Sequence, residues 1–217
     1  MKTDMQLQLD VLAELQWEPS VHAAGIGVEV SEGVVTLDGS VGTYPEKWEA
    51  EKAAQRVAGV KAVAVDLAVR FPHPEVHDDA DMAHAASQAL HHLAVGKDGA
   101  VKVLVENGWI ELTGELQWDF QRRAVEAVLR HVPGVKGINS YVTLGPRVSV
   151  VAVKAEIDAA LKRRAMLDSH RISVSVQGTE VTLSGCVSSW AEREVAQHTA
   201  WGTTGVLSVV DHTVMAA

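Results

Sequence analysis

A phrase of eight residues occurs three times in this chain of 217 residues, and it constrains the fold more than any other feature. It reads VVTLDGSV at 34–41, WIELTGEL at 109–116 and EVTLSGCV at 180–187. A second glycine, followed by valine, stands 20 residues after the glycine of each phrase; the pairs are Gly39 and Gly59, Gly114 and Gly134, and Gly185 and Gly205. Repetition at fixed spacing indicates one small unit used three times, so we predict three modules of about 70 residues rather than one large domain.

Each copy has the same predicted order of elements: helix, strand, strand, helix, strand. The repeated phrase is the middle strand, because its alternating apolar and polar residues are typical of a strand with one buried face. The Asn107-Gly108 pair before the second copy is a strong hairpin signal. Apolar residues then recur at helical spacing between the paired glycines. We expect first helices at 4–16, 79–94 and 149–165, first strands at 25–30, 100–105 and 171–176, and last strands at 60–69, 135–144 and 206–214.

This order predicts an α+β fold of three tandem α-β-β-α-β modules. The strand–helix–strand step is expected to be a right-handed crossover, which gives a small mixed three-stranded sheet with two helices on one face. The predicted modules are 1–72, 73–146 and 147–217, with a histidine-containing linker at 71–78. A domain of this size is only marginally stabilised by its own core, so we also expect the modules to pack on one another.

The repeated glycines are predicted to be structural. A glycine inside a strand weakens it unless another group must come close, so we expect the second helix of each module to lie directly over Gly39, Gly114 and Gly185. The second glycine of each pair suits the left-handed backbone found at a helix C-terminus.

The charge of the chain argues against several partners. Its net charge is −9, with 11 acidic and 6 basic side chains in 1–72, 10 and 6 in 73–146, and 7 and 7 in 147–217. Nucleic acid is therefore excluded as a general partner, because phosphate neutralisation needs a basic surface. No disulfide can form within the chain, since Cys186 is its single cysteine. The acidic N-terminal residues lack the apolar core of a signal peptide, so we expect a cytoplasmic protein, or a periplasmic one if a leader has been removed.

Three groups of residues are candidates for contact with a lipid surface or a partner. The first is the aromatic and basic stretch at 118–123, with Trp118, Phe120, Arg122 and Arg123. The second is the basic cluster Lys162, Arg163 and Arg164. Both have an ordinary alternative, in which the rings pack locally and the cations are solvated at a helix end. The third is Trp109, which the strand pattern places outside its own core; a neighbouring module or an external partner is expected to cover it.

The sequence holds little that suggests chemistry. Histidines recur between His73 and His92, and we expect a hydrated, pH-responsive hinge there rather than a metal site, which needs converging ligands. A phosphate-binding glycine loop, a Gly-x-Ser-x-Gly elbow and a His-Glu-x-x-His motif are all absent from the sequence. The positions that recur between copies are apolar or glycine. We therefore predict no enzyme activity, no cofactor and no bound metal.

The pattern Gly-x-Val-x-Leu-x-Gly-x-Val, followed by a helix, Gly-Val and a last strand, resembles the BON domain (bacterial OsmY and nodulation). Three copies cover nearly the whole chain. The resemblance implies an OsmY-like, stress-associated binding module that contacts phospholipid, or an envelope-associated protein, through exposed module surfaces. The alternative is a cytoplasmic scaffold that binds protein partners, including another copy of itself, and never meets lipid.

Overall fold

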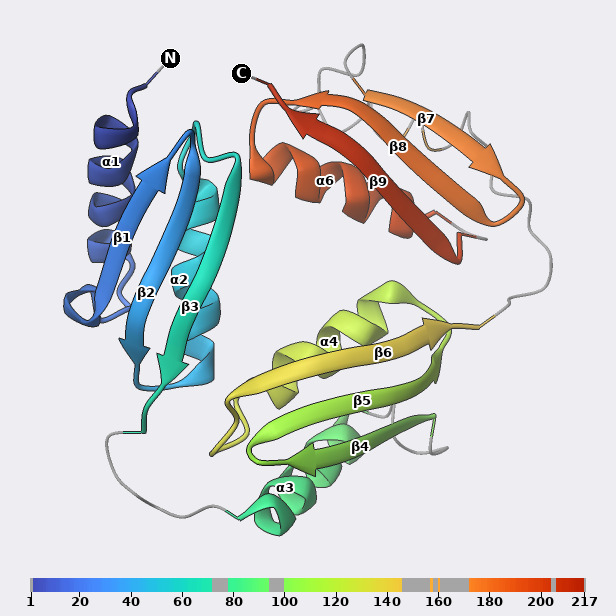
Figure 1. Ribbon diagram of the computed structural model, residues 1–217. Coiled ribbons are helices and arrows are strands. Elements are labelled where there is room, and N and C mark those ends of the chain that lie inside the picture. Colours follow the sequence, from blue (N-terminus) through green and yellow to red (C-terminus); the bar gives the residue numbers. More distant parts are fainter. Residues whose placement is uncertain are drawn as a thin grey trace.

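The computed structural model of the chain describes residues 2–71, 78–93, 100–145, 157, 160, 172–203 and 206–216. Three α+β modules follow one another along these residues, each with its own three-stranded sheet (Figure 1). We refer to residues 2–71 as module 1, 78–145 as module 2 and 157–216 as module 3. The predicted fold class and element order are confirmed; the first helix expected in module 3 lies mostly outside the described residues, of which 157 and 160 are helical.

The boundaries of the elements agree with the predicted ranges to within a few residues. Module 1 contains α1 (Asp4–Trp17), the short 3-10 helix η1 (Ala23–Gly25), β1 (Ile26–Ser31), β2 (Val34–Val41), α2 (Tyr44–Arg56) and β3 (Ala62–Val69). Module 2 contains α3 (Asp79–His92), β4 (Val101–Glu106), β5 (Trp109–Leu116), α4 (Asp119–Leu129) and β6 (Gly137–Leu144). Module 3 contains β7 (Ile172–Gln177), β8 (Glu180–Val187), α6 (Trp190–Trp201) and β9 (Ser208–Met215).

The repeated phrase is the central strand of every sheet. In module 1, β2 pairs antiparallel with β1, so that Leu37 lies opposite Val28, and parallel with β3, so that Leu37 lies opposite Val65. The same register recurs in the other two sheets. A parallel pair cannot be joined by a tight turn, which is why α2, α4 and α6 span the step between the second and third strands.

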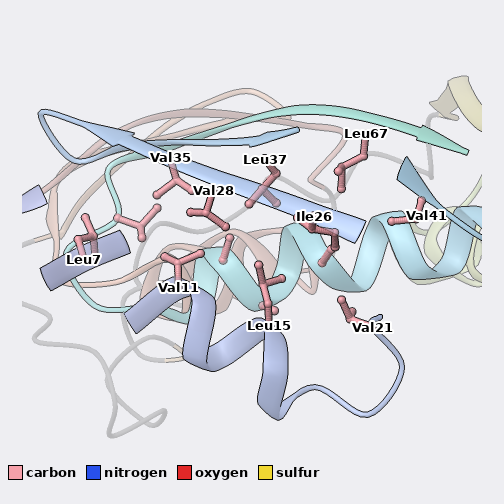
Figure 2. Close-up of a cluster of buried hydrophobic side chains, with 14 residues drawn as sticks. Leu7, Val11, Leu15, Val21, Ile26, Val28, Val35, Leu37, Val41 and Leu67 are labelled. Atoms are coloured by element: carbon pink, nitrogen blue, oxygen red, sulfur yellow. The ribbon is translucent and has the colours of Figure 1, made fainter. Parts of the chain in front are cut away.

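Helices cover one face of each sheet and enclose the core: two in module 1, two in module 2, and α6 among the described residues of module 3. Figure 2 shows Leu7, Val11 and Leu15 of α1 directed toward Val35 and Leu37 of β2. On α2 the residues that meet the sheet are alanines, whose small side chains let the helix approach closely: Ala50, Ala53 and Ala54 are fully buried. Burying one leucine completely contributes about 1.5–3 kcal/mol. Among the described residues no helix lies on the opposite face of a sheet, and we call that face the outer face.

The central-strand glycines serve a different purpose from the one predicted. Gly39 has a φ of +120° and Gly114 one of +138°, values that favour glycine. A Cβ at Gly39 would collide with the carbonyl oxygen of Gly25, and one at Gly114 with that of Ala100. The prediction that the second helix lies over these glycines is wrong, because the close neighbour is the backbone just before the first strand. Gly185 shares the positive φ, at +117°.

The second glycine of each pair, where it is described, lies in a turn that follows the second helix of its module. The N–H of Val60 donates to the carbonyl of Val57 (3.2 Å), which places Gly59 in a turn with a φ of +104°. The equivalent bond in module 2 joins Val135 to Val132, with Gly134 at a φ of +89°. The predicted left-handed backbone is thus confirmed at these two positions, and Gly205 lies outside the described residues.

An aspartate at the start of the first helix holds the hairpin turn in modules 1 and 2. The carboxylate of Asp4 accepts bonds from the backbone N–H groups of Glu32 (2.8 Å) and Gly33 (3.1 Å). Asp79 does the same for Asn107 (2.7 Å) and Gly108 (2.9 Å). Both turns need positive φ values, and a buried or half-buried N–H needs an acceptor. This bond therefore ties the first helix to the sheet.

Candidate interaction surface

The second helices of the three modules lie toward the middle of the arrangement, where each module contacts the next (Figure 1). One contact residue in each module occupies the same position, nine residues after the repeated strand glycine: Trp48, Arg123 and Glu194. Each of them meets a residue near the end of the next module's second helix. Module 1 contacts module 2, module 2 contacts module 3, and module 3 contacts module 1, so the chain closes into a head-to-tail ring.

Between modules 1 and 2 the contact is aromatic. The guanidinium carbon of Arg130 lies 3.8 Å from the centroid of the Trp48 ring, which is close enough for a cation–π interaction. Tyr44, the first residue of α2, packs against the core of module 2. Burial raises the pKa of Tyr44, and the nearby charge of Arg130 acts in the opposite direction.

Between modules 2 and 3 the contact uses the aromatic and basic stretch singled out in the sequence. Arg122 lies with its guanidinium carbon 5.2 Å from the centroid of Trp201, and Arg123 hydrogen-bonds the ring of His198. Both arginines also pair with the buried carboxylate of Asp119, at 2.9 Å for Arg123 Nε. These two cations therefore have partners inside the chain, which leaves them less able to bind an external anionic surface.

The two aromatic residues of that stretch stay near each other. The rings of Trp118 and Phe120 lie with their centroids 6.4 Å apart, and Phe120 is 60% exposed. The structure brings the aromatic residues together at the start of α4 and turns the arginines toward module 3.

The ring closes between modules 3 and 1. The indole N–H of Trp190 donates to the carbonyl oxygen of Val60 (3.1 Å), and Lys52 lies 3.7 Å from Glu194. Two cavities flank this contact. One, of about 370 Å³, is lined by Trp48, Lys52, Trp190 and Glu194 among others; the second, of about 220 Å³, is lined by residues from both ends of the chain.

The outer face of module 2 carries large exposed apolar side chains. Leu104 is 58% exposed, Trp109 is 46% exposed and Tyr141 is 62% exposed. Trp109 lies across Gly137, the residue opposite it on β6, where a Cβ would collide with the indole ring. The glycine therefore lets the ring lie flat on its own sheet while part of it remains open to solvent. The sequence indicated Trp109 but gave no reason to group Leu104 with it.

Two buried or partly buried carboxylates elsewhere have structural partners. Burial acts to raise the pKa of Glu46, but bonds from the backbone N–H groups of His22 (2.8 Å) and Gly42 (2.7 Å), and from the His22 ring, outweigh it and hold the pKa below its usual value. Burial also acts to raise the pKa of Asp211, but hydrogen bonds from Thr213 and Arg193 outweigh it and lower the pKa. These charges cap a helix and fix a strand, and they need no ligand to explain them.

Several predicted candidates lie outside the described residues. They are Lys162, Arg163, Arg164, His73 and His77. In the described part of the chain, no three His, Cys, Asp or Glu side chains converge as a metal site would require. Cys186 is half-buried. Across the same described residues, no helix has the length and apolar character needed to cross a membrane.

The fold and these surfaces define a tandem-repeat α+β protein whose modules contact one another through their second helices. The chain belongs to the BON domain family, whose model matches residues 3–70, 78–146 and 149–217. The predicted resemblance, with three tandem copies, is therefore confirmed. BON domains are binding modules without catalytic activity, and they mediate contacts with proteins or lipids.

None of the curated proteins compared with the chain matches it. Among solved structures, the chain is similar to CdsD, a structural protein of the type III secretion system of Chlamydia trachomatis (15% identity, 96% of this chain and 91% of that chain, TM-score 0.24). It is also similar to the C-terminal domain of CdsD (15% identity, 100% of both chains, TM-score 0.26). TM-scores this low support no conclusion on fold or function.

Proposed function

We propose that the chain is a non-enzymatic binding protein that holds a protein partner on the outer face of module 2. The observation that carries this proposal is the group of three large exposed side chains there, Leu104, Trp109 and Tyr141. Exposed apolar residues gathered on one face mark interaction sites, and aromatic residues are enriched in the centres of protein interfaces. The ring of modules supports this role, because a preorganised surface loses little freedom on binding.

The equivalent positions in the other modules support the choice of face. The residue at the position of Trp109 is Val34 in module 1 and Glu180 in module 3. Neither offers a large aromatic ring, although the three backbones have the same register. If every outer face bound the same partner, the side chains would be expected to agree as the backbones do.

Phospholipid binding is the second candidate, and Phe120 favours it. Its ring is 60% exposed at the start of α4, as an interfacial anchor must be. The same stretch argues against a strong anionic-lipid contact, because Arg122 and Arg123 already pair with Asp119. A protein partner is therefore the function that the geometry supports best.

Site-specific photo-crosslinking tests this proposal. A photoreactive phenylalanine analogue replaces Trp109 in one variant and Val34 in a matched variant, and both are irradiated in the source cells. We expect one protein to crosslink at position 109 and not at 34. That protein, once identified and purified, is expected to bind the wild-type chain and to lose affinity for Tyr141→Ala.

Vesicle flotation with phosphatidylglycerol provides the opposing test. Flotation that Phe120→Ala abolishes, without a protein adduct at position 109, would replace the proposal with lipid binding. The absence of both an adduct and flotation would refute both candidates.

A further inference from the structure

The outer face of module 2 combines its aromatic residues with negative charge. Glu106 lies opposite Trp109 on β4, and Glu111 lies between Leu104 on one side and Asn139 on the other. Glu115 continues the same face of β5, whereas Lys102 is the basic side chain there. An acidic surface of this kind repels anionic lipid and favours a cationic partner.

These carboxylates have no partner inside the described part of the chain. The ion pairs between described residues include neither Glu106 nor Glu111 nor Glu115. Glu46, Asp119 and Asp211, in contrast, are buried or partly buried and are hydrogen-bonded by neighbouring groups. The outer-face charges are therefore available to an incoming group.

The chain itself shows which cation suits an indole ring. Arg130 lies over Trp48, Arg122 over Trp201, and Arg193 lies 5.3 Å from the centroid of Trp190. A guanidinium group is planar and weakly hydrated, so it can stack on a ring while it donates two hydrogen bonds to a carboxylate. Trp109 with Glu106 or Glu111 offers both halves of such a site.

The outer faces of modules 1 and 3 do not combine an exposed aromatic ring with carboxylates beside it. Module 1 has the carboxylates Glu29, Asp38 and Asp66, but its residue at the tryptophan position is Val34. Module 3 has Gln177 and Thr182 at the positions of Glu106 and Glu111, and Glu180 at the position of the tryptophan. The combination of exposed aromatic rings and free carboxylates is thus confined to module 2 among the described outer faces.

We propose that the outer face of module 2 binds arginine side chains of a partner protein, with a guanidinium group stacked on Trp109 and paired with Glu106 or Glu111. This inference rests on the proposed function and specifies the chemistry of its partner. Tyr141 and Leu104 flank the site and cover the aliphatic stems of the same side chains.

Fluorescence anisotropy with three labelled peptides tests the proposal on the full chain. In the first peptide arginine alternates with threonine; lysine replaces arginine in the second, and glutamate replaces it in the third. We expect the arginine peptide to bind more tightly than the lysine peptide, and the glutamate peptide not to bind. Trp109→Ala is expected to weaken the arginine peptide about two- to fivefold, as loss of an exposed cation–π contact would.

Matched variants separate this site from general attraction to an acidic protein. The double variant Glu106→Gln/Glu111→Gln keeps the shape of both side chains and is expected to weaken binding by up to about fivefold. Asp66→Asn removes a charge from the outer face of module 1 and is expected to leave binding unchanged. Tyr141→Ala provides a second test of the aromatic contribution, in case loss of the Trp109 ring destabilises β6.

Three results would overturn the inference. They are equal binding by the wild type and the double variant Glu106→Gln/Glu111→Gln, equal weakening by Asp66→Asn, and no binding of the arginine peptide. A protein adduct at position 109 that persists without arginine binding would leave the proposed function standing and remove only the assigned chemistry. Absence of both would remove the two proposals together.

Discussion

Replacement of Gly114 by alanine is expected to unfold module 2 selectively. The new Cβ would meet the carbonyl oxygen of Ala100 well inside the 3.0 Å that real Cβ atoms keep, and both groups belong to the backbone, so no side chain can move aside. The positive φ of +138° adds strain for any residue with a Cβ. The bond from the N–H of Glu115 to Ala100 (3.0 Å) would also be stretched or lost.

The magnitude follows from these three contributions. Unfavourable φ costs about 1–2 kcal/mol, displacement of a packed backbone about 1–3 kcal/mol, and loss of one hydrogen bond about 0.5–1.5 kcal/mol. The sum is about 2.5–6.5 kcal/mol, and a core of this size rarely supplies more than about 3–5 kcal/mol of stability. Gly178→Ala is the matched control, because Gly178 also has a positive φ (+61°) but has nothing within 4 Å of a Cβ.

Urea unfolding followed by circular dichroism, with amide hydrogen exchange to locate the change, measures both variants. We expect Gly114→Ala to lose exchange protection in β4, β5 and β6, and Gly178→Ala to lose only the cost of its φ, about 1–2 kcal/mol. Equal destabilisation by the two variants would refute the reasoning, because it would show that the approach of the Ala100 carbonyl has no cost.

Three further predictions concern the ring, one carboxylate and one packed indole. Trp190→Phe keeps a ring but removes the N–H that donates to Val60, so the contact between modules 3 and 1 should be weakened by about 1 kcal/mol. Small-angle scattering should then give a larger radius of gyration, and an unchanged radius would contradict this. Glu46 has a folded-state pKa below its usual 4.5, so the stability that its charge contributes is fully present above pH 4.5 and is lost as pH falls through the folded-state pKa. Glu46→Gln should therefore lower the urea midpoint at pH 7 and make that midpoint fall less steeply in acid than the wild-type midpoint. A fall parallel to that of the wild type would argue against this role. Gly137→Ala should destabilise the wild type more than it destabilises Trp109→Ala, since the indole fills the space; additive effects in a double-mutant cycle would contradict that packing.

The local fold could be predicted because its signals recur at fixed spacing. Alternation around Leu37 and its equivalents identified the buried face, and the Asn107-Gly108 pair identified the turn. The reason for the strand glycine could not be predicted, since a strand weakened by glycine is compatible with several close neighbours. The identity of the close neighbour depends on φ and on the end of the adjacent strand, which the pattern does not encode.

The ring could not be predicted, although it uses equivalent positions. Trp48, Arg123 and Glu194 share one place in the repeat but differ in chemistry, so a search for recurring residue types passes over them. Their partners also come from other modules, at separations that no helical or strand period reaches. The bond from Asp79 to the Asn107 turn was missed for a related reason: an aspartate at a helix start has an ordinary local explanation in the macrodipole.

The ring brings the path of the chain back to its starting point. Lys2 and Ala216 line the same small cavity, and Figure 1 shows the two ends of the chain beside each other. Each contact between modules is made by residues within the modules, so it does not depend on which two modules are covalently consecutive. A circular permutant that joins residue 216 to residue 2 and opens between modules 1 and 2 would keep every such contact intact. The contacts between the modules therefore do not determine which module comes first in the chain.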